Sequence, residues 1–265
     1  MRQNGSISFE ASLTALSPIT LEEMTGVKLL NRIDTKYLTT EATLLEVLKD
    51  AAEAGYRVLE TEGQRISPYS SIYYDTAGLR MFYDHHNRRL TRQKVRTREY
   101  VNSGEAFLEI KRKNNHGRTK KKRIAIPREE LMDFRADDKA CDYLAAKSWF
   151  TAPELSPVLE TAFRRITLVN PDRTERLTID TALSFRNFRT GHKTDLQDAV
   201  IIELKQDGHT ASRMKGIFLD HRVKPVRISK YCIALTLTTP GAKSNRFKEK
   251  VRTIEKTIGK KLTII

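Results

Sequence analysis

The sequence predicts an α+β fold in which a β-barrel is covered on its outside by helices. Its strand-like segments alternate charged and apolar side chains, so one face of each predicted strand is basic and the other apolar. Helix-like segments with one apolar stripe lie between these strands and can cover the apolar face. The pattern Glu-x-Lys occurs at Glu109/Lys111 and at Glu203/Lys205, which favours a barrel of two related halves.

Composition limits the class of partner. The 265 residues suffice for one large β-rich domain or two small ones. With 48 Lys and Arg against 33 Asp and Glu, the net charge is +15, which favours an anionic partner: nucleic acid, a nucleotide, polyphosphate or an acidic membrane. Cys141 and Cys232 make neither a disulfide framework nor a zinc site, and no membrane span or signal peptide is recognisable. A cytoplasmic protein is expected.

The first half of the chain alternates predicted strands and helices. Pro18 and Thr20 introduce the first helix, and Gly55 ends the second because glycine readily takes the left-handed conformation that follows helices. Pro127 ends the predicted strand over 120–126. In order, the expected elements are a polar lead with a helix over 21–30, a strand over 32–38, a helix over 41–54, strands over 56–60 and 70–74, a turn over 75–78, a helix ending at His86, strands over 94–100, 107–113 and 120–126, and helical structure over 128–150.

Charged side chains share one face of several of these strands. The predicted strands over 94–100 and 107–113 form the two arms of a hairpin. Alternation places Lys94, Arg96, Arg98 and Tyr100 on one face of the first arm. On the second arm it groups Phe107, Glu109, Lys111 and Lys113, opposite Ala106, Leu108 and Ile110. An ordinary solvated sheet face would alternate in the same way, but the repetition on several strands favours an inward-facing pocket for a polyanion.

Local rules predict the positions of two histidines and two aromatic residues. The adjacent His85 and His86 are expected at the surface, because neighbouring helical residues point about 100° apart and cannot both face one metal ion. Trp149 and Phe150 are expected in the core.

The second half repeats the pattern of the first. Predicted strands place Arg165 beside Phe163, Arg176 beside Asp180, and Glu203 beside Lys205. Ser229 is expected to cap a helix that runs to about Thr238. In order, the elements are strands over 161–169, 176–180 and 200–205, a helix over 212–221, and the helix after Ser229.

These motifs, in their order and spacing, resemble the VTC domain of polyphosphate polymerases, which belongs to the triphosphate tunnel metalloenzyme or CYTH-like superfamily. The resemblance covers about residues 25–238. The motifs are Thr35-Lys36-Tyr37, Ser71-Ile72-Tyr73-Tyr74-Asp75, Arg96-x-Arg98-x-Tyr100, Phe107-Leu108-Glu109-x-Lys111, Arg165, Arg176-x-x-x-Asp180, Glu203-x-Lys205 and Ser229-Lys230-Tyr231. The resemblance implies an antiparallel β tunnel with helices outside, in which basic residues hold a nucleoside triphosphate and a growing polyphosphate while a carboxylate holds Mn²⁺ or Mg²⁺.

The same resemblance implies roles for individual residues. The catalytic set is Arg96, Arg98, Lys111, Arg165, Arg176 and Lys230. The phosphate-binding set is Lys36, Lys121, Lys122, Lys205 and Arg227, where the family pattern favours Lys121 but a one-residue slip in register would exchange it for a neighbour. The metal ligand is Glu203, with Glu109 as the next candidate.

Three classes of function are compatible with this assignment. The first is a polyphosphate polymerase that moves the γ-phosphate of ATP to a polyphosphate end, which needs alignment and charge neutralisation but no protein nucleophile. The second is a metal-dependent triphosphatase or tripolyphosphatase, although Arg32-x-Asp34-x-Lys36 stands where that branch has alternating glutamates. The third is a module that binds polyphosphate or nucleic acid without catalysis. ATP and polyphosphate are the expected partners; the oligomeric state is left open.

A basic tail follows the predicted domain of residues 1–240. Residues 241–265 place Phe247, Val251, Ile254 and Ile258 at helical spacing among many lysines and arginines. Such a helix could bind an acidic membrane on the cytoplasmic side or emerging polyphosphate. The favoured interpretation is that its apolar stripe packs on the barrel and its charges face water.

Overall fold

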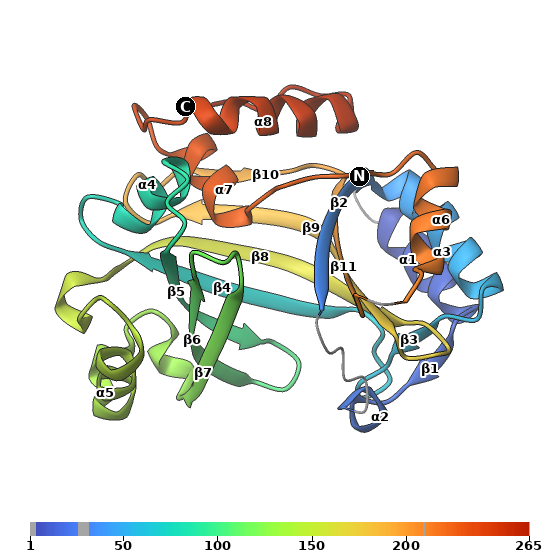
Figure 1. Ribbon diagram of the computed structural model, residues 1–265, viewed down its shortest axis with the longest axis horizontal. Coiled ribbons are helices and arrows are strands. Elements are labelled where there is room, and N and C mark those ends of the chain that lie inside the picture. The colour runs from blue at the N-terminus through green and yellow to red at the C-terminus, as the bar shows by residue number, and fades with distance from the viewer. Residues whose placement is uncertain (1–3, 26–31, 209, 265) are drawn as a thin grey trace.

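The structure is a computed structural model that describes residues 4–25, 32–208 and 210–264 (Figure 1). Its helices are α1 (Asn4–Thr14), α2 (Leu21–Thr25), α3 (Glu41–Glu53), α4 (Arg80–His86), α5 (Asp138–Lys147), α6 (Arg213–Asp220), α7 (Lys230–Thr238) and α8 (Asn245–Ile258), with short 3-10 turns η1 (Arg128–Leu131), η2 (Phe134–Ala136) and η3 (Ala152–Glu154). Its strands are β1 (Ser17–Ile19), β2 (Ile33–Thr40), β3 (Arg57–Leu59), β4 (Ser67–Asp75), β5 (Arg92–Tyr100), β6 (Glu105–Lys113), β7 (Thr119–Ile126), β8 (Ser156–Val169), β9 (Glu175–Asn187), β10 (Lys193–Asp195), β11 (Ala199–Gln206) and β12 (Lys224–Pro225).

One sheet of 12 strands organises the molecule. Its main path runs β12-β2-β11-β9-β8-β4-β5-β6-β7, and β1, β3 and β10 attach at its side. Neighbouring strands are antiparallel except for the pair β1 and β3. The predicted α+β class is therefore confirmed. The antiparallel sheet with helices packed around it agrees with the predicted tunnel architecture, although no ladder in the described residues joins β7 to β12 or β2, so the sheet is open along that seam.

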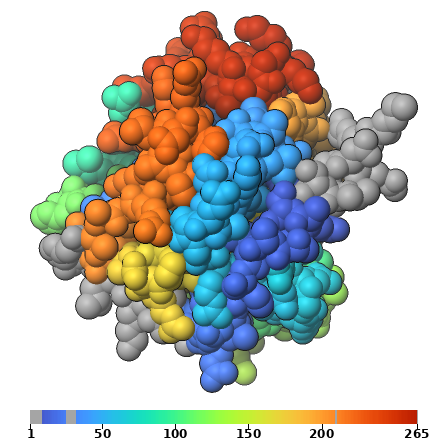
Figure 2. Space-filling model, turned by 90° about the vertical axis from the view of Figure 1, so that its right-hand side faces the viewer, coloured from blue at the N-terminus to red at the C-terminus, as the bar shows by residue number. Residues whose placement is uncertain are grey.

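The outer face of one half of the sheet is covered by α1, α3 and α6. Leu44, Val47, Leu48 and Ala51 form the buried stripe of α3, which lies against apolar side chains of β2, β8, β9 and β11. The side-chain oxygen of Thr40 accepts a hydrogen bond from the Thr43 amide and so caps the helix at its start. Figure 2 shows α1, α3 and α6 side by side at this end of the molecule. The prediction that this helix covers the apolar face is confirmed.

The outer face of the other half is covered by α5 and the turns next to it. Leu108 and Ile110 of β6 pack with Phe134, Leu144 and Phe150 in a second buried cluster. The predicted helical structure over 128–150 is thus broken into two 3-10 turns and one helix.

Helix α7 lies on the inner face of the sheet. Leu38, Phe163 and Ile201 share the faces of Lys36, Arg165 and Glu203 on their strands, and they pack with the fully buried residues of α7. Helix α8 lies over α7 and beside α4 (Figure 1). One end of the inner face is therefore apolar and filled by a helix, and the remainder carries the charged side chains.

The apolar stripe of α8 is buried, as the favoured interpretation of the tail predicted. Phe247, Val251, Ile254 and Ile258 belong to the cluster around α7. Among the described residues, no helix is both long and apolar enough to cross a membrane. The division of the chain at residue 240 stays a prediction.

Several local details differ from the expectations. The N-terminal lead, expected to be helical and polar, does form a helix, α1, but Phe9 and Leu13 of this helix are buried against α3. Of the expected helix over 21–30, only α2 is described, and the remainder lies outside the described residues. Trp149 is 48% exposed, with the Arg112 guanidinium 4.8 Å from its ring, because Phe150 alone turns into the core. His86 is buried and His85 partly so, because Phe247 of α8 lies against both rings.

Candidate functional site

Three carboxylates on the inner face each contact two cations. We use the term inner face for the side of the sheet that carries Arg96, Arg165 and Glu203. Strand alternation places most of these groups there, since residues two apart on one strand point the same way. The groups are Glu109 with Arg96 and Lys121, Asp180 with Arg165 and Lys230, and Glu203 with Lys36 and Lys205.

Glu109 lies at the centre of the first group. It accepts hydrogen bonds from Arg96 Nε and Nη2 at 2.8 and 2.6 Å on one oxygen and from Lys121 Nζ at 2.8 Å on the other. Burial would raise the pKa of the Glu109 carboxyl, but Arg96, Arg98 and Lys121 hold it well below its usual range. Glu109 is therefore ionised, and its side chain is only 2% exposed.

Asp180 of β9 links strand β8 to helix α7, because its carboxylate pairs with one cation from each. Arg165 of β8 donates to both of its oxygens, from Nε at 2.6 Å and from Nη2 at 2.8 Å, which is the bidentate geometry that guanidinium favours. Lys230, the first residue of α7, forms an ion pair with the same carboxylate. Its ammonium also lies 4.3 Å from the centre of the Phe163 ring. Asp180 thus fixes the start of α7 against the inner face.

Glu203 is the most accessible of the three carboxylates. Lys36 of β2 lies 3.2 Å from one oxygen and Lys205 lies 2.9 Å from the other. Burial would raise the pKa of the Glu203 carboxyl, but Lys205, Lys36 and Lys111 lower it strongly. Its side chain is 22% exposed, against 2% for Glu109 and 4% for Asp180.

Arg98, Lys111 and Arg176 are among the inner-face cations that form no ion pair with a carboxylate in the described part of the chain. Burial and repulsion from Arg96 lower the pKa of Arg98 to about 10, and its Nε donates to Ser71 Oγ at 2.9 Å. Lys111 is open to solvent, yet surrounding protein atoms and the charge of Arg96 lower the pKa of its ammonium to about 8. The Nε of Arg176 is buried without a hydrogen-bond partner. The inner face therefore carries surplus positive charge.

The two margins of the open sheet approach each other across this face. Lys111 belongs to β6 near one margin, and its ammonium interacts electrostatically with Glu203 of β11 and Lys36 of β2 near the other. The sheet must curl for these side chains to interact, because β6 and β11 are separated by four strands along the path. The charged groups consequently surround one volume instead of lining a flat surface.

The register of β6 and β7 separates the two candidate lysines of the basic run. Lys121 lies opposite Lys111 and reaches Glu109, so it points to the inner face. Lys122 lies opposite Ile110, whose side chain is in the outer core, so it points to the other face. The structure therefore does not bring Lys122 to the site. Arg227 lies after β12, is exposed, and stands at the margin of the site next to Lys113.

Comparison with known proteins assigns the family. A family model of the VTC domain matches residues 31–239. The chain belongs to the VTC domain family. A search of curated proteins gives no match.

Solved structures similar to this VTC domain include three of low sequence identity. A candidate adenylate cyclase from Vibrio parahaemolyticus is 13% identical, with a TM-score of 0.45, and the match covers 76% of this chain and 97% of that one. A protein from Pyrococcus horikoshii is 14% identical, with a TM-score of 0.43 and coverage of 77% and 98%. A candidate adenylyl cyclase from Hippeastrum, described as having a dominant triphosphatase activity, is 12% identical, with a TM-score of 0.43 and coverage of 83% and 96%.

Sequence reasoning missed two inner-face residues of this VTC domain. Asp180 belongs to the motif Arg176-x-x-x-Asp180, which predicts no role for it, although it holds both Arg165 and Lys230. Tyr73 accepts a hydrogen bond from Arg96 Nη1 at 2.9 Å. Burial would raise the pKa of the Tyr73 hydroxyl, but Arg96, Arg98 and Lys94 together lower it to about 8. Tyr73 could have been found from strand alternation, which places its side chain on the same face of β4 as that of Ser71.

The VTC domain offers few ligands to a metal ion. The described residues contain no group of three or more His, Cys, Asp or Glu side chains that could hold one. Hard divalent cations, however, bind to one or two carboxylates together with substrate phosphates. The partly exposed Glu203 fits such a site, whereas Glu109 and Asp180 are covered by their cations.

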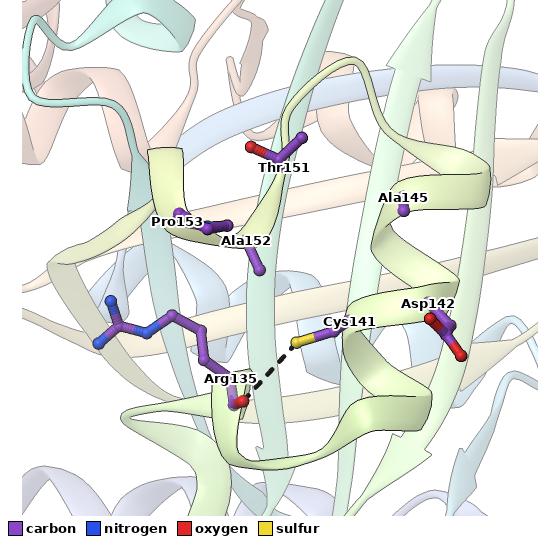
Figure 3. Close-up of a pocket in the computed structure, with 7 residues that line it drawn as sticks. All are labelled: Arg135, Cys141, Asp142, Ala145, Thr151, Ala152 and Pro153. Atoms are coloured by element: carbon purple, nitrogen blue, oxygen red, sulfur yellow. Dashed lines mark hydrogen bonds between the residues drawn. The ribbon is translucent and has the colours of Figure 1, made fainter.

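A separate pocket lies on the other side of the sheet. It has a volume of about 380 Å³ and is bordered by η2, α5 and η3, with Arg135, Cys141, Asp142 and Thr151 among its lining residues (Figure 3). Cys141 Sγ donates to the backbone oxygen of Arg135 at 3.7 Å. The lining is mostly apolar and is remote from the inner face, so this pocket does not belong to the site.

Proposed function

We propose that this VTC domain transfers the γ-phosphate of ATP to the end of an inorganic polyphosphate bound along the inner face. The surplus of cations carries the proposal. Each of the three carboxylates already contacts two cations, and Arg98, Lys111 and Arg176 add charge that no described carboxylate offsets through an ion pair. A chain of phosphates would supply the missing negative charge within a curled, partly desolvated sheet.

The chemistry requires no protein nucleophile. Phosphoryl transfer depends mainly on alignment and on neutralising charge on the phosphate oxygens. Arg96 and Arg165 are already oriented by Glu109 and Asp180, so their remaining N–H groups can bind phosphate at little entropic cost. The acceptor is the terminal phosphate of the chain, which is anionic at neutral pH, and a general base is therefore unnecessary.

A divalent cation, Mn²⁺ or Mg²⁺, would be held by Glu203 together with substrate phosphates. When bound, it would neutralise charge on the phosphate oxygens. Lys36 and Lys205, which now contact Glu203, are long and flexible enough to turn from the carboxylate to the phosphates.

The proposal is tested by incubating the purified protein with ATP and Mn²⁺ or Mg²⁺ and separating the products by gel electrophoresis. Long phosphate chains are expected. Lys111→Ala should reduce their yield, while Lys120→Ala, which removes the same charge from the outer face of β7, should not. Release of free phosphate alone would identify a hydrolase, and binding of polyphosphate without turnover would identify a binding module.

The metal assignment is tested by two matched substitutions. Glu203→Gln should abolish metal-dependent turnover but leave metal-free binding of tripolyphosphate intact. Glu109→Gln serves as the comparison, because it also removes one carboxylate from the inner face. Turnover retained by a folded Glu203→Gln variant would mean that the metal lies elsewhere, with Glu109 the next candidate.

A further inference from the structure

A second group of cations continues the inner face toward α8. Lys113 follows Lys111 on the same face of β6, and Arg92 of β5 lies directly opposite Lys113. Phe247 of α8 lies 6.0 Å from the ring of His85, and the charges of Arg92, Lys113 and Lys250 all act on that ring. Partial burial lowers the pKa of Lys113 and of Lys250, and the charge of Arg227 lowers both further, while Glu249 raises that of Lys250. We call Arg92, Lys113, Arg227 and Lys250 the cationic rim.

The rim is held in place by contacts that do not involve its charges. Phe247 of α8 lies 5.6 Å from the ring of Phe82 in α4, which fixes α8 beside the start of β5. The Val226 amide donates to the backbone oxygen of Lys36 at 2.7 Å and so anchors the segment that carries Arg227. Three separate parts of the chain thereby bring like charges together.

Nothing in the described part of the chain offsets this charge through an ion pair. No rim side chain contacts a carboxylate there, although Glu249 is the sequence neighbour of Lys250. Like charges destabilise a fold unless an anion binds between them. The inner-face carboxylates Glu109, Asp180 and Glu203, by contrast, each hold two cations. The rim thus resembles Arg98, Lys111 and Arg176, which also form no ion pair with a described carboxylate, and differs from the cations held by Glu109, Asp180 and Glu203.

We propose that the rim is a second binding site for polyphosphate, which holds the part of a long chain that extends beyond the inner face. The site begins at Lys111 and passes between Lys113 and Arg227 to Lys250 on α8. Because α8 lies after residues 31–239, which match the VTC domain, part of this site is supplied by a segment outside the family match. The proposal rests on the proposed function, because the inner face must bind the first phosphates of the same chain.

The site predicts a dependence on chain length. Tripolyphosphate should be held by the inner face alone, whereas a polyphosphate several times longer should reach the rim as well. The double variant Lys113→Ala/Lys250→Ala should therefore weaken binding of the long chain about three- to tenfold, given the modest strength of partly exposed charge contacts, and leave tripolyphosphate binding unchanged.

The experiment is calorimetric titration of the intact protein with tripolyphosphate and with a long polyphosphate of defined length. Lys248→Ala/Arg252→Ala is the matched control, since it removes two positive charges from exposed positions of the same helix. Loss of affinity for the long chain only, in the rim variant only, supports the rim.

Two other outcomes would overturn it. Equal losses for both polyphosphates, or equal losses in the rim and control variants, would mean that the rim is not a separate site while the inner face still binds. If the unaltered protein bound neither ligand, the proposed function and the rim would both be wrong.

Discussion

At the scale of single residues, the site is defined by which cations have a carboxylate and which do not. Arg96 and Arg165 are fixed by Glu109 and Asp180, so they are pre-oriented donors. Lys111 and Tyr73 are different, because each titrates near neutral pH, with a pKa of about 8. Binding of an anion at this site should therefore change the protonation of these two groups.

At about pH 8.5, Lys111 and Tyr73 should take up protons when tripolyphosphate binds, and this uptake is measured as a difference from the Lys111→Arg and Tyr73→Phe variants, because the terminal phosphates of the ligand can release protons on binding to cations. The empty site holds Lys111 mostly neutral and Tyr73 mostly ionised at that pH, since it lies above both pKa values. A bound polyanion favours the lysine cation and disfavours tyrosinate, so both pKa values rise and protons are absorbed. Calorimetry in two buffers of different ionisation enthalpy measures this uptake.

Substitutions separate the two contributions. Lys111→Arg keeps the charge at all accessible pH values and should remove the lysine share, and Tyr73→Phe should remove the other. At about pH 6.5, where both groups of the empty site are already protonated, the unaltered protein should show little uptake. Equal uptake at both pH values, or uptake that survives both substitutions, would contradict the assignment.

The face on which a side chain lies was predictable from strand alternation, as for Arg96, Glu109, Lys111 and Glu203, whereas their roles were implied by the family resemblance and stay predictions. Contacts between distant parts of the chain were not. Asp180 holds Lys230 across 50 positions of sequence, and alternation along one strand gives no distance to a helix elsewhere. His86 was predicted at the surface because the sequence around it does not indicate that Phe247 packs against its ring.

At the scale of elements, capping residues and strand alternation predicted where several helices and strands begin and end. They did not predict whether the edges of the sheet join. Ser229 caps α7 as predicted, with its Oγ accepting from the Cys232 amide. Whether a sheet closes depends on the number, tilt and stagger of all its strands, and no single segment records these. The sheet agrees with the expected tunnel architecture, but in the described residues its two margins interact through side chains and not through a backbone ladder.

The register of β7 makes a sharp comparison possible. Lys121→Ala should weaken tripolyphosphate binding about two- to fivefold, because Lys121 faces Glu109 and the inner face and is partly exposed. Lys122→Ala removes the same charge from the outer face and should have no effect. Titration of both variants measures the difference, and an equal effect would show that overall charge, not orientation, is responsible.

Helix α8 should contribute to stability. Deleting residues 241–265 removes the buried side chains of Phe247, Val251, Ile254 and Ile258, so the melting temperature should fall. Ile254→Ala alone should lower the free energy of unfolding by about 2–5 kcal/mol, because this side chain is fully buried. Thermal unfolding measures the first effect and denaturant unfolding the second.

The same deletion tests the alternative interpretation of the tail. The apolar stripe of α8 is occupied by the core and is not free to enter a bilayer, so binding to anionic liposomes should be weak with and without the tail at physiological salt. Strong binding of the full chain that is lost on truncation, with no change in melting, would show that the stripe serves a membrane instead.

At the scale of the whole molecule, a net charge of +15 is concentrated by curvature of the sheet. Cations from β2, β5, β6, β8, β9 and α7 face one volume. Their mutual repulsion opposes folding of the empty protein and favours an anionic ligand, so stability and binding are coupled through the same charges.

Salt should therefore affect stability and affinity in opposite directions. Raising sodium chloride from about 0.01 M to about 1 M shortens the screening length from about 30 Å to about 3 Å. The empty protein should melt at a higher temperature, because repulsion is screened, and tripolyphosphate should bind more weakly. Differential scanning calorimetry and titration measure the two effects.

The double variant Lys111→Met/Arg176→Met provides the control. It removes two cations that form no ion pair with described carboxylates, so salt should raise its melting temperature less than that of the unaltered protein. Equal increases in both proteins would mean that salt acts on surface charge in general.

The open seam of the sheet also bears on aggregation. An unpaired strand margin offers free backbone donors and acceptors to a strand of another molecule, and proteins commonly prevent such pairing with charged residues or proline. Strand β7 carries four consecutive cations, Lys120 to Arg123, and β12 ends in Pro225. Two copies would have to bring like charges together to pair through β7. Lys120 and Lys122, which face away from the site, thus help to keep the molecules apart.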